Sequence, residues 1–87
     1  MNLFPTFGAG LPLAEFLAKH GTDAHRARWQ AAHAQTALTD PQKELLRTFT
    51  RRTNVLVLAG AWCGDCASQC PIFERIAEAA PCVVTRY

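Results

Sequence analysis

The fold class follows from NVLVLAGAWCGDC, residues 54–66, where the helical patterns of the preceding chain give way to a continuous apolar run. The first half is a continuous run of Val, Leu and Ala that ends at Gly60, which is typical of a strand covered on both faces in a parallel sheet. The second half contains Cys63 and Cys66, three positions apart. We therefore expect a cysteine pair directly after the carboxyl end of a central parallel strand.

The residues that follow complete a βαβ unit. Residues 71–80, PIFERIAEAA, carry apolar side chains at helical spacing, and Pro81 ends the predicted helix. Residues 82–87, CVVTRY, have high β-propensity. The fold class predicted is therefore α/β, with two parallel strands joined by a right-handed crossover.

Before the first strand, the pattern predicts about three helices. The first ten residues have no clear period, and we expect an irregular lead-in there. Helices are expected over about 12–21, 22–38 and 39–52, with Pro12, Thr22 and Thr39 as start signals. The third helix should turn three apolar side chains toward a core: Leu45, Leu46 and Phe49.

Three side chains of the second predicted helix share one face. His25, Trp29 and His33 recur at intervals of four residues. Such a stripe fits either a ligand surface or an amphipathic packing edge. We favour the packing edge, because His and Trp at this spacing more often pack than bind.

Composition excludes several classes of function. A chain of 87 residues forms one small domain, and 49% hydrophobic residues predict a packed core. The net charge of +2 is scattered, so we expect no nucleic-acid binding. No apolar stretch approaches the roughly 20 residues that span a bilayer, and the N-terminus lacks a basic start. We expect a cytoplasmic protein without membrane partners, whose thiols are kept reduced for catalysis or metal binding.

Cys63 is expected between the end of the strand and the first turn of the helix. Unpaired backbone N–H groups and the helix dipole stabilise a thiolate there. In such a Cys-x-x-Cys setting the pKa can fall from about 8.5 to between about 3.5 and 7.5. Cys66 lies inside the first turn and is more shielded, which suits it to attack a mixed disulfide formed by Cys63.

The other two cysteines are expected to be small buried hydrophobes. Cys70 lies one turn beyond Cys66 with a nearly parallel Cβ vector, and Cys82 lies about 25 Å from Cys63. The spacings after the first pair are three and then eleven residues, which does not fit a closed zinc site. A metal or Fe–S cluster held by Cys63 and Cys66 of two chains remains an alternative. We otherwise expect no cofactor.

The motif WCGDC after an apolar strand, followed by PIFERIA, resembles the Trp-Cys-Gly-x-Cys motif of the thioredoxin family. The resemblance covers residues 39–87, so that residues 1–38 are interpreted as an N-terminal helical extension. It implies that Cys63 is the attacking nucleophile and Cys66 the resolving thiol. It assigns supporting roles to an aromatic wall, a permissive spacer and a helix-kinking proline, which are Trp62, Gly64 and Pro71.

Three departures from the family pattern matter. Asp65 occupies the position where thioredoxins usually carry proline, and its charge opposes a thiolate on Cys63, which favours a reducing pair. Val57 occupies the position of the family's buried aspartate, so Asp65 or water is left to accept the proton of Cys66. Residues 39–87 match only the N-terminal half of a thioredoxin domain, so the predicted sheet has an open edge at residues 82–87, CVVTRY. We expect a longer chain, or a dimer, to complete it.

These observations predict a thiol–disulfide oxidoreductase that works in the reducing direction through Cys63 and Cys66. Its substrates would be protein or small-molecule disulfides, and a reductase or thiol pool would restore the dithiol. Two alternatives stay open: a metal or Fe–S module that uses the same cysteines, and a non-catalytic helical adaptor that binds a partner through residues 1–38.

Overall fold

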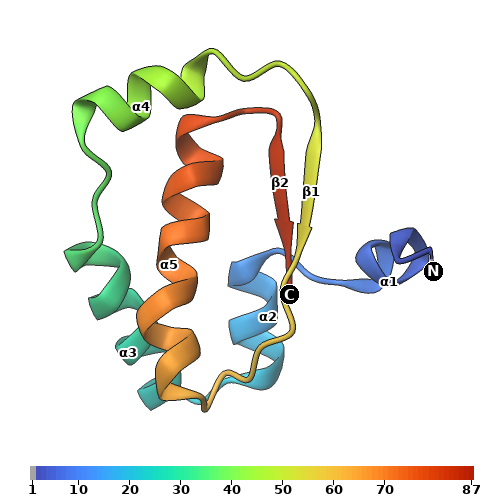
Figure 1. The fold of residues 1–87 in the computed structure, drawn as a ribbon. Coiled ribbons are helices and arrows are strands. Elements are labelled where there is room, and N and C mark those ends of the chain that lie inside the picture. The colour runs from blue at the N-terminus through green and yellow to red at the C-terminus, as the bar shows by residue number, and fades with distance from the viewer. Residues whose placement is uncertain (1) are drawn as a thin grey trace.

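A two-stranded parallel sheet and one long helix form the centre of the molecule (Figure 1). A computed structural model describes residues 2–87, and four helices precede the sheet within that range. The elements in chain order are α1 (Phe4–Ala9), α2 (Leu13–His20), α3 (Asp23–Gln35), α4 (Asp40–Arg47), β1 (Thr53–Leu56), α5 (Gly64–Ala79) and β2 (Val83–Arg86).

The βαβ unit expected from the sequence is present. Strands β1 and β2 pair in parallel, with Thr53 opposite Val83 and Leu56 opposite Arg86. The backbone of Tyr87 exchanges two hydrogen bonds with Leu11, at 2.8 and 2.9 Å. Because adjacent strand residues direct their backbone groups to opposite edges, the segment before α2 lies along the edge of β2 that faces away from β1. The edge expected to be open at residues 82–87 is therefore paired at Tyr87.

The three helices predicted before the sheet correspond to α2, α3 and α4. The side chains of Thr22 and Thr39 each accept a hydrogen bond from the backbone N–H three residues on. His25 and Gln42 complete the two capping boxes by accepting the N–H of those threonines. The polar residues that marked these starts in the sequence therefore act as the predicted caps.

The prediction of an irregular lead-in over the first ten residues was wrong. Residues Phe4–Ala9 form the short helix α1, which begins with Pro5 in its first turn. Proline presets the backbone for a helix start, and Phe4 and Phe7 stack at a centroid distance of 6.3 Å. A helix of six residues is too short to produce a recognisable period in the sequence.

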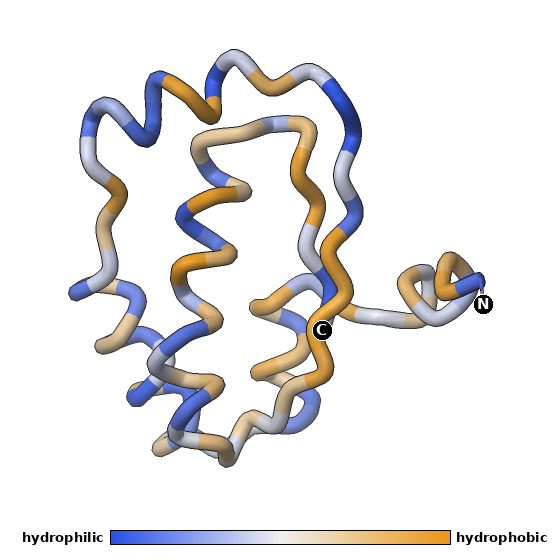
Figure 2. The backbone as a smooth tube through the Cα atoms, in the orientation of Figure 1, coloured by the Kyte–Doolittle hydropathy of each residue, from blue (hydrophilic) through white to orange (hydrophobic). Residues whose placement is uncertain are grey.

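The prediction that β1 is covered on both faces was also wrong. Thr53 and Asn54 are exposed, and Leu58, just beyond the strand, is 89% exposed. Helix α5 packs against β2, whereas β1 is contacted by the short α1, which leaves part of the apolar run uncovered. Figure 2 shows this run as a hydrophobic stretch of the tube that continues into the loop after β1.

Helix α4 is present, but it ends at Arg47 rather than near residue 52, and it buries less than the sequence predicted. Leu45 is 61% exposed and Phe49 is 47% exposed, while Leu46 alone of the three is half-buried. The reason is visible in Figure 1, where α4 crosses the C-terminal end of α5 and has no second layer against its other side. The prediction that all three side chains face a core is therefore wrong for Leu45 and Phe49.

The core lies at the opposite end of α5, between α2, α3 and the end of β2. Trp29 is 1% exposed and meets the ring of Tyr87 edge-on at 6.4 Å. The predicted packing edge on α3 is confirmed for Trp29, while His25 caps the helix and His33 Nε2 lies 3.3 Å from Glu78 Oε1. A domain boundary at residue 38 stays a prediction, although α3 and β2 share this core. No helix within residues 2–87 is both long and apolar enough to cross a membrane.

Candidate functional site

The loop after β1 carries Cys63 to the start of α5. The backbone N–H of Cys63 donates to the carbonyl oxygen of Gly60 at 3.0 Å, which closes a tight turn. The indole of Trp62 folds over Gly60, where a Cβ atom would lie 2.7 Å from the ring. Only glycine leaves room for this arrangement. Trp62 is itself 72% exposed.

Trp29, from the distant helix α3, also contacts this loop. Its indole Nε1 donates to the carbonyl oxygen of Ala61 at 2.9 Å, and both residues are buried. This hydrogen bond joins α3 to the turn that immediately precedes the cysteines. Helix α3 therefore belongs to the support of the site, a role that no local pattern in the sequence indicated because the two residues lie 32 positions apart.

Cys63 is the N-cap of α5. Its Sγ accepts a hydrogen bond from the backbone N–H of Cys66 at 3.3 Å. Hydrogen bonds from Cys66, first from the thiol and then from the backbone N–H, hold the pKa of Cys63 below its ordinary value. The charge of Asp65 acts weakly in the opposite direction, as the sequence predicted. The geometry thus favours a thiolate on Cys63.

Cys66 has the opposite tendency. Its pKa is raised, chiefly because its thiol donates a hydrogen bond to the sulfur of Cys63, and burial acts in the same direction. Both cysteines are half-buried free thiols in this structure. The pair therefore combines one sulfur that favours the anion with one that keeps its proton.

The other two cysteines lie apart from this pair, Cys70 in the core and Cys82 beyond the far end of α5. Cys70 is 4% exposed within the core, and burial raises the pKa of its thiol to about 11. The interpretation of Cys70 as a buried hydrophobe is confirmed. The same interpretation was wrong for Cys82, which is only half-buried beyond the far end of α5, where its Sγ donates to the carbonyl oxygen of Phe49 at 3.5 Å.

The remaining residues of the motif lie where the helix begins and where it passes through the core. Gly64 and Asp65 are exposed in the first turn of α5. Pro71 is fully buried, and α5 continues through it from Gly64 to Ala79. Because proline has no N–H, the helix lacks one backbone hydrogen bond at this point.

Tyr87 is a buried polar residue that the sequence did not single out. Its hydroxyl group is inaccessible and makes no hydrogen bond to any part of residues 2–87. Burial raises the pKa of Tyr87 well above its ordinary value. The neighbouring carboxylate of Glu74 instead accepts a hydrogen bond from Thr85 Oγ1 at 2.7 Å. Tyr87 and Thr85 lie at the end of the chain and Glu74 lies in α5, so no local sequence pattern predicts that these side chains meet.

Metal-ligating side chains are dispersed over the described part of the chain. No three of its His, Cys, Asp and Glu side chains come together as a group that could hold a metal ion. Cys63 and Cys66 lie together, but Cys70 is one turn deeper in the core and Cys82 is at the other end of α5. A single chain thus brings two cysteine sulfurs together at this position.

Comparison with known families gives one result. A family model described as thioredoxin matches residues 10–87, which include α2 and α3 as well as the βαβ unit. Comparison with curated proteins and with solved structures found no match. The family match covers most of the chain and agrees with the cysteine pair at the N-terminus of α5. The chain therefore belongs to the thioredoxin family.

Proposed function

We propose that this protein is a thiol–disulfide oxidoreductase that reduces disulfides, with Cys63 as nucleophile and Cys66 as resolving thiol. The main support is the opposite behaviour of the two sulfurs across one hydrogen-bonded turn. The pKa of Cys63 is lowered and that of Cys66 is raised, and the backbone N–H of Cys66 donates to Cys63 Sγ at 3.3 Å. The attacking cysteine reacts as a thiolate, whereas the resolving cysteine reacts only after the mixed disulfide has formed.

The reaction has two exchange steps. In the first, the Cys63 thiolate attacks one sulfur of the substrate disulfide, the substrate S–S bond breaks, and its second sulfur leaves as a thiolate that takes a proton from water. In the second, Cys66 loses its proton and attacks Cys63 Sγ, which releases the first substrate sulfur as a thiol. Two electrons pass to the substrate, and the protein retains a disulfide between Cys63 and Cys66.

The rest of the motif supports these steps. Trp62, exposed beside the pair, forms one wall of the substrate approach. The exposed Gly64 keeps that approach clear of a side chain, and the buried Pro71 fixes the helix against the core. Asp65 lies one residue before Cys66 in the solvent-exposed turn, so it or a water molecule accepts the proton of Cys66.

The proposed cycle needs two partners and a reducing compartment. The substrate is a protein or small-molecule disulfide, and a reductase or a thiol pool returns the Cys63–Cys66 disulfide to the dithiol. We place this cycle in the cytoplasm, where thiols are kept reduced. A second chain that pairs with the open edge of β1 is part of the same proposal, because unpaired strand edges favour such contacts.

The assignment is tested by insulin reduction with dithiothreitol as the final reductant. Cys63→Ser should lower the rate to that of dithiothreitol alone, because no thiolate remains to attack. Cys66→Ser should accumulate a mixed disulfide between Cys63 and the substrate, visible by mass. Cys82→Ser is the matched control, since Cys82 lies beyond the far end of α5, and it should keep the wild-type rate. Full activity of Cys63→Ser would contradict the proposal.

A further inference from the structure

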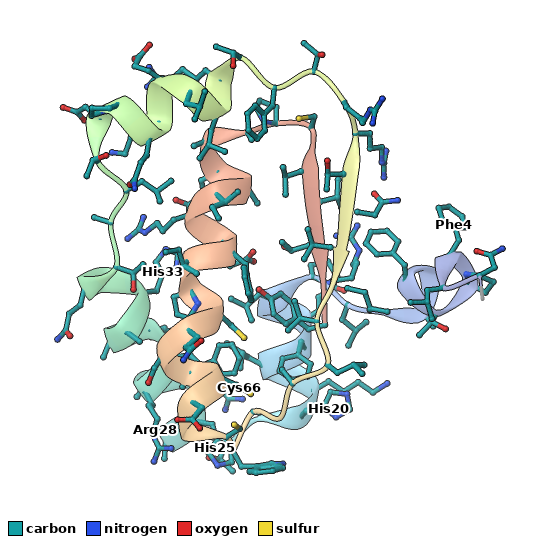
Figure 3. All side chains as sticks on the ribbon, viewed as in Figure 1. Phe4, His20, His25, Arg28, His33 and Cys66 are labelled. Atoms are coloured by element: carbon teal, nitrogen blue, oxygen red, sulfur yellow. The ribbon has the colours of Figure 1, made fainter. Side chains whose placement is uncertain are left out.

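An arginine of α3 lies beside the cysteine pair. The guanidinium Nη1 of Arg28 is 3.9 Å from the position that a Cβ atom on Gly64 would occupy. Gly64 separates Cys63 from Asp65 in the motif. Figure 3 shows Arg28 and His25 at the same end of the molecule as Cys66. The side chain of Arg28 therefore reaches from α3 to the first turn of α5.

The position of Arg28 follows from the packing of α3. The next residue, Trp29, is buried and donates to Ala61 in the loop before Cys63. Because Trp29 is fixed in the core, the side chain of Arg28 lies at the solvent-exposed border of the contact between Trp29 and Ala61. The hydrogen bond that supports the loop thus also determines where the charge of Arg28 lies.

Arg28 differs from other arginines of the protein in its contacts. Arg26 donates to the carbonyl oxygens of Leu17 and Gly21, at 3.0 and 2.9 Å. Arg75 donates to the carbonyl oxygens of His33 and Thr36, both at 2.8 Å. Arg28 is exposed and makes no hydrogen bond or ion pair with residues 2–87. Its donors are available to a bound molecule.

The other groups around the site do not provide this charge. Asp65 carries a negative charge within the motif. His25 Nδ1 already accepts the backbone N–H of Thr22. Trp62 offers an exposed aromatic surface without charge. A carboxylate on a docked substrate would therefore be repelled by Asp65 and attracted by the guanidinium of Arg28.

We propose that Arg28 is a specificity residue that favours disulfide substrates with a carboxylate near the S–S bond. This inference rests on the proposed function, since it concerns the substrate that Cys63 attacks. A planar guanidinium matches a carboxylate through two parallel hydrogen bonds. Because Arg28 is exposed, the gain is modest, at about two- to fivefold in the rate of reaction with an anionic disulfide.

The test compares three small disulfides that differ in charge: glutathione disulfide (anionic), bis(2-hydroxyethyl) disulfide (neutral) and cystamine (cationic). Reduced protein is mixed with each disulfide, and the loss of the Cys63 and Cys66 thiols is followed by alkylation and mass analysis. The variants are Arg28→Gln and, as a matched control, Arg51→Gln, an exposed arginine before β1.

Arg28→Gln should slow the reaction with glutathione disulfide about two- to fivefold, leave the neutral disulfide unchanged and speed the reaction with cystamine. Added salt should reduce the difference between wild type and variant. Arg51→Gln should resemble the wild type with all three. The neutral disulfide separates charge recognition from a change in Cys63 itself, which would alter all three rates alike.

Two outcomes would overturn the inference. If Arg28→Gln changed the three rates equally, or changed none, Arg28 would have no role in substrate choice. The proposed function would still stand in that case, provided that the wild-type protein reacted with the three disulfides. If the wild-type protein reacted with none of them, the proposed function and this inference would both fail.

Discussion

The two ends of α5 contain cysteines in contrasting surroundings. At the N-terminal end, Cys63 accepts a hydrogen bond from the first turn of the helix, and α2 and α3 form a core beside it. Beyond the C-terminal end, Cys82 donates to a backbone carbonyl, and α4 leaves Leu45 and Phe49 exposed. The acceptor for Cys82 lies in the segment between α4 and β1, so only Cys63 bonds to the free backbone donors of a helix terminus.

The difference shows that the buried core and the cysteine pair lie at the same end of the molecule. Trp29 fills the core and also binds the carbonyl oxygen of Ala61, next to the motif. No comparable residue joins α4 to the far end of α5, because α4 has no fully buried side chain. Changes at the Cys63 end should therefore affect folding and reactivity together.

The largest expected effect is on stability. Trp29→Ala should lower the free energy of unfolding by about 3–5 kcal/mol, because it empties a fully buried site and leaves the Ala61 carbonyl without its donor. Leu45→Ala, at an exposed position of α4, should change it by less than about 0.5 kcal/mol. Urea unfolding of both variants measures this contrast. Equal losses would show that the two ends are equally packed.

The next largest effect concerns the reactivity of thiols along α5. The pKa of Cys70 is raised to about 11 and that of Cys63 is lowered, so Cys63 has far more thiolate at neutral pH. Alkylation by iodoacetamide should modify Cys63 faster than Cys70 by about 100-fold or more, as measured by peptide mass analysis. Comparable rates at the two positions would mean that the helix N-terminus does not activate Cys63.

A smaller effect is expected at Asp65. Its charge raises the pKa of Cys63, so Asp65→Asn should lower that pKa and move the rise of the alkylation rate to lower pH. Below the pKa, the alkylation rate should increase by about twofold, since both groups are solvent-accessible. The control is Asp40→Asn at the start of α4, which should leave the profile unchanged. A shift to higher pH would contradict the assigned sign.

The sequence was most informative where contacts are local. The caps Thr22 and Thr39 act within one turn of their helices, and the strand, cysteine pair and helix follow one another directly in the chain. The cysteine pair after β1 was likewise predictable, because the N-terminus of α5 is fixed by Cys63 and the residues that follow. Each of these features needs only a short stretch of sequence.

What the sequence did not reveal depends on contacts between distant residues. The exposure of Leu58 depends on how the helices of residues 2–87 pack around the sheet, which no periodicity encodes. The support of Ala61 by Trp29 and the approach of Arg28 to Gly64 both require α3 to lie against α5. The buried hydroxyl of Tyr87 likewise becomes evident only when β2 is placed beside α5.

Oxidation of the purified protein in graded glutathione buffers tests whether Cys63 and Cys66 form a redox pair. Intact mass and peptide mapping would follow the state of each thiol. We expect the loss of two hydrogens, mapped to a Cys63–Cys66 disulfide with a defined midpoint, while Cys70 and Cys82 stay free. Four thiols that never pair under these conditions would contradict it.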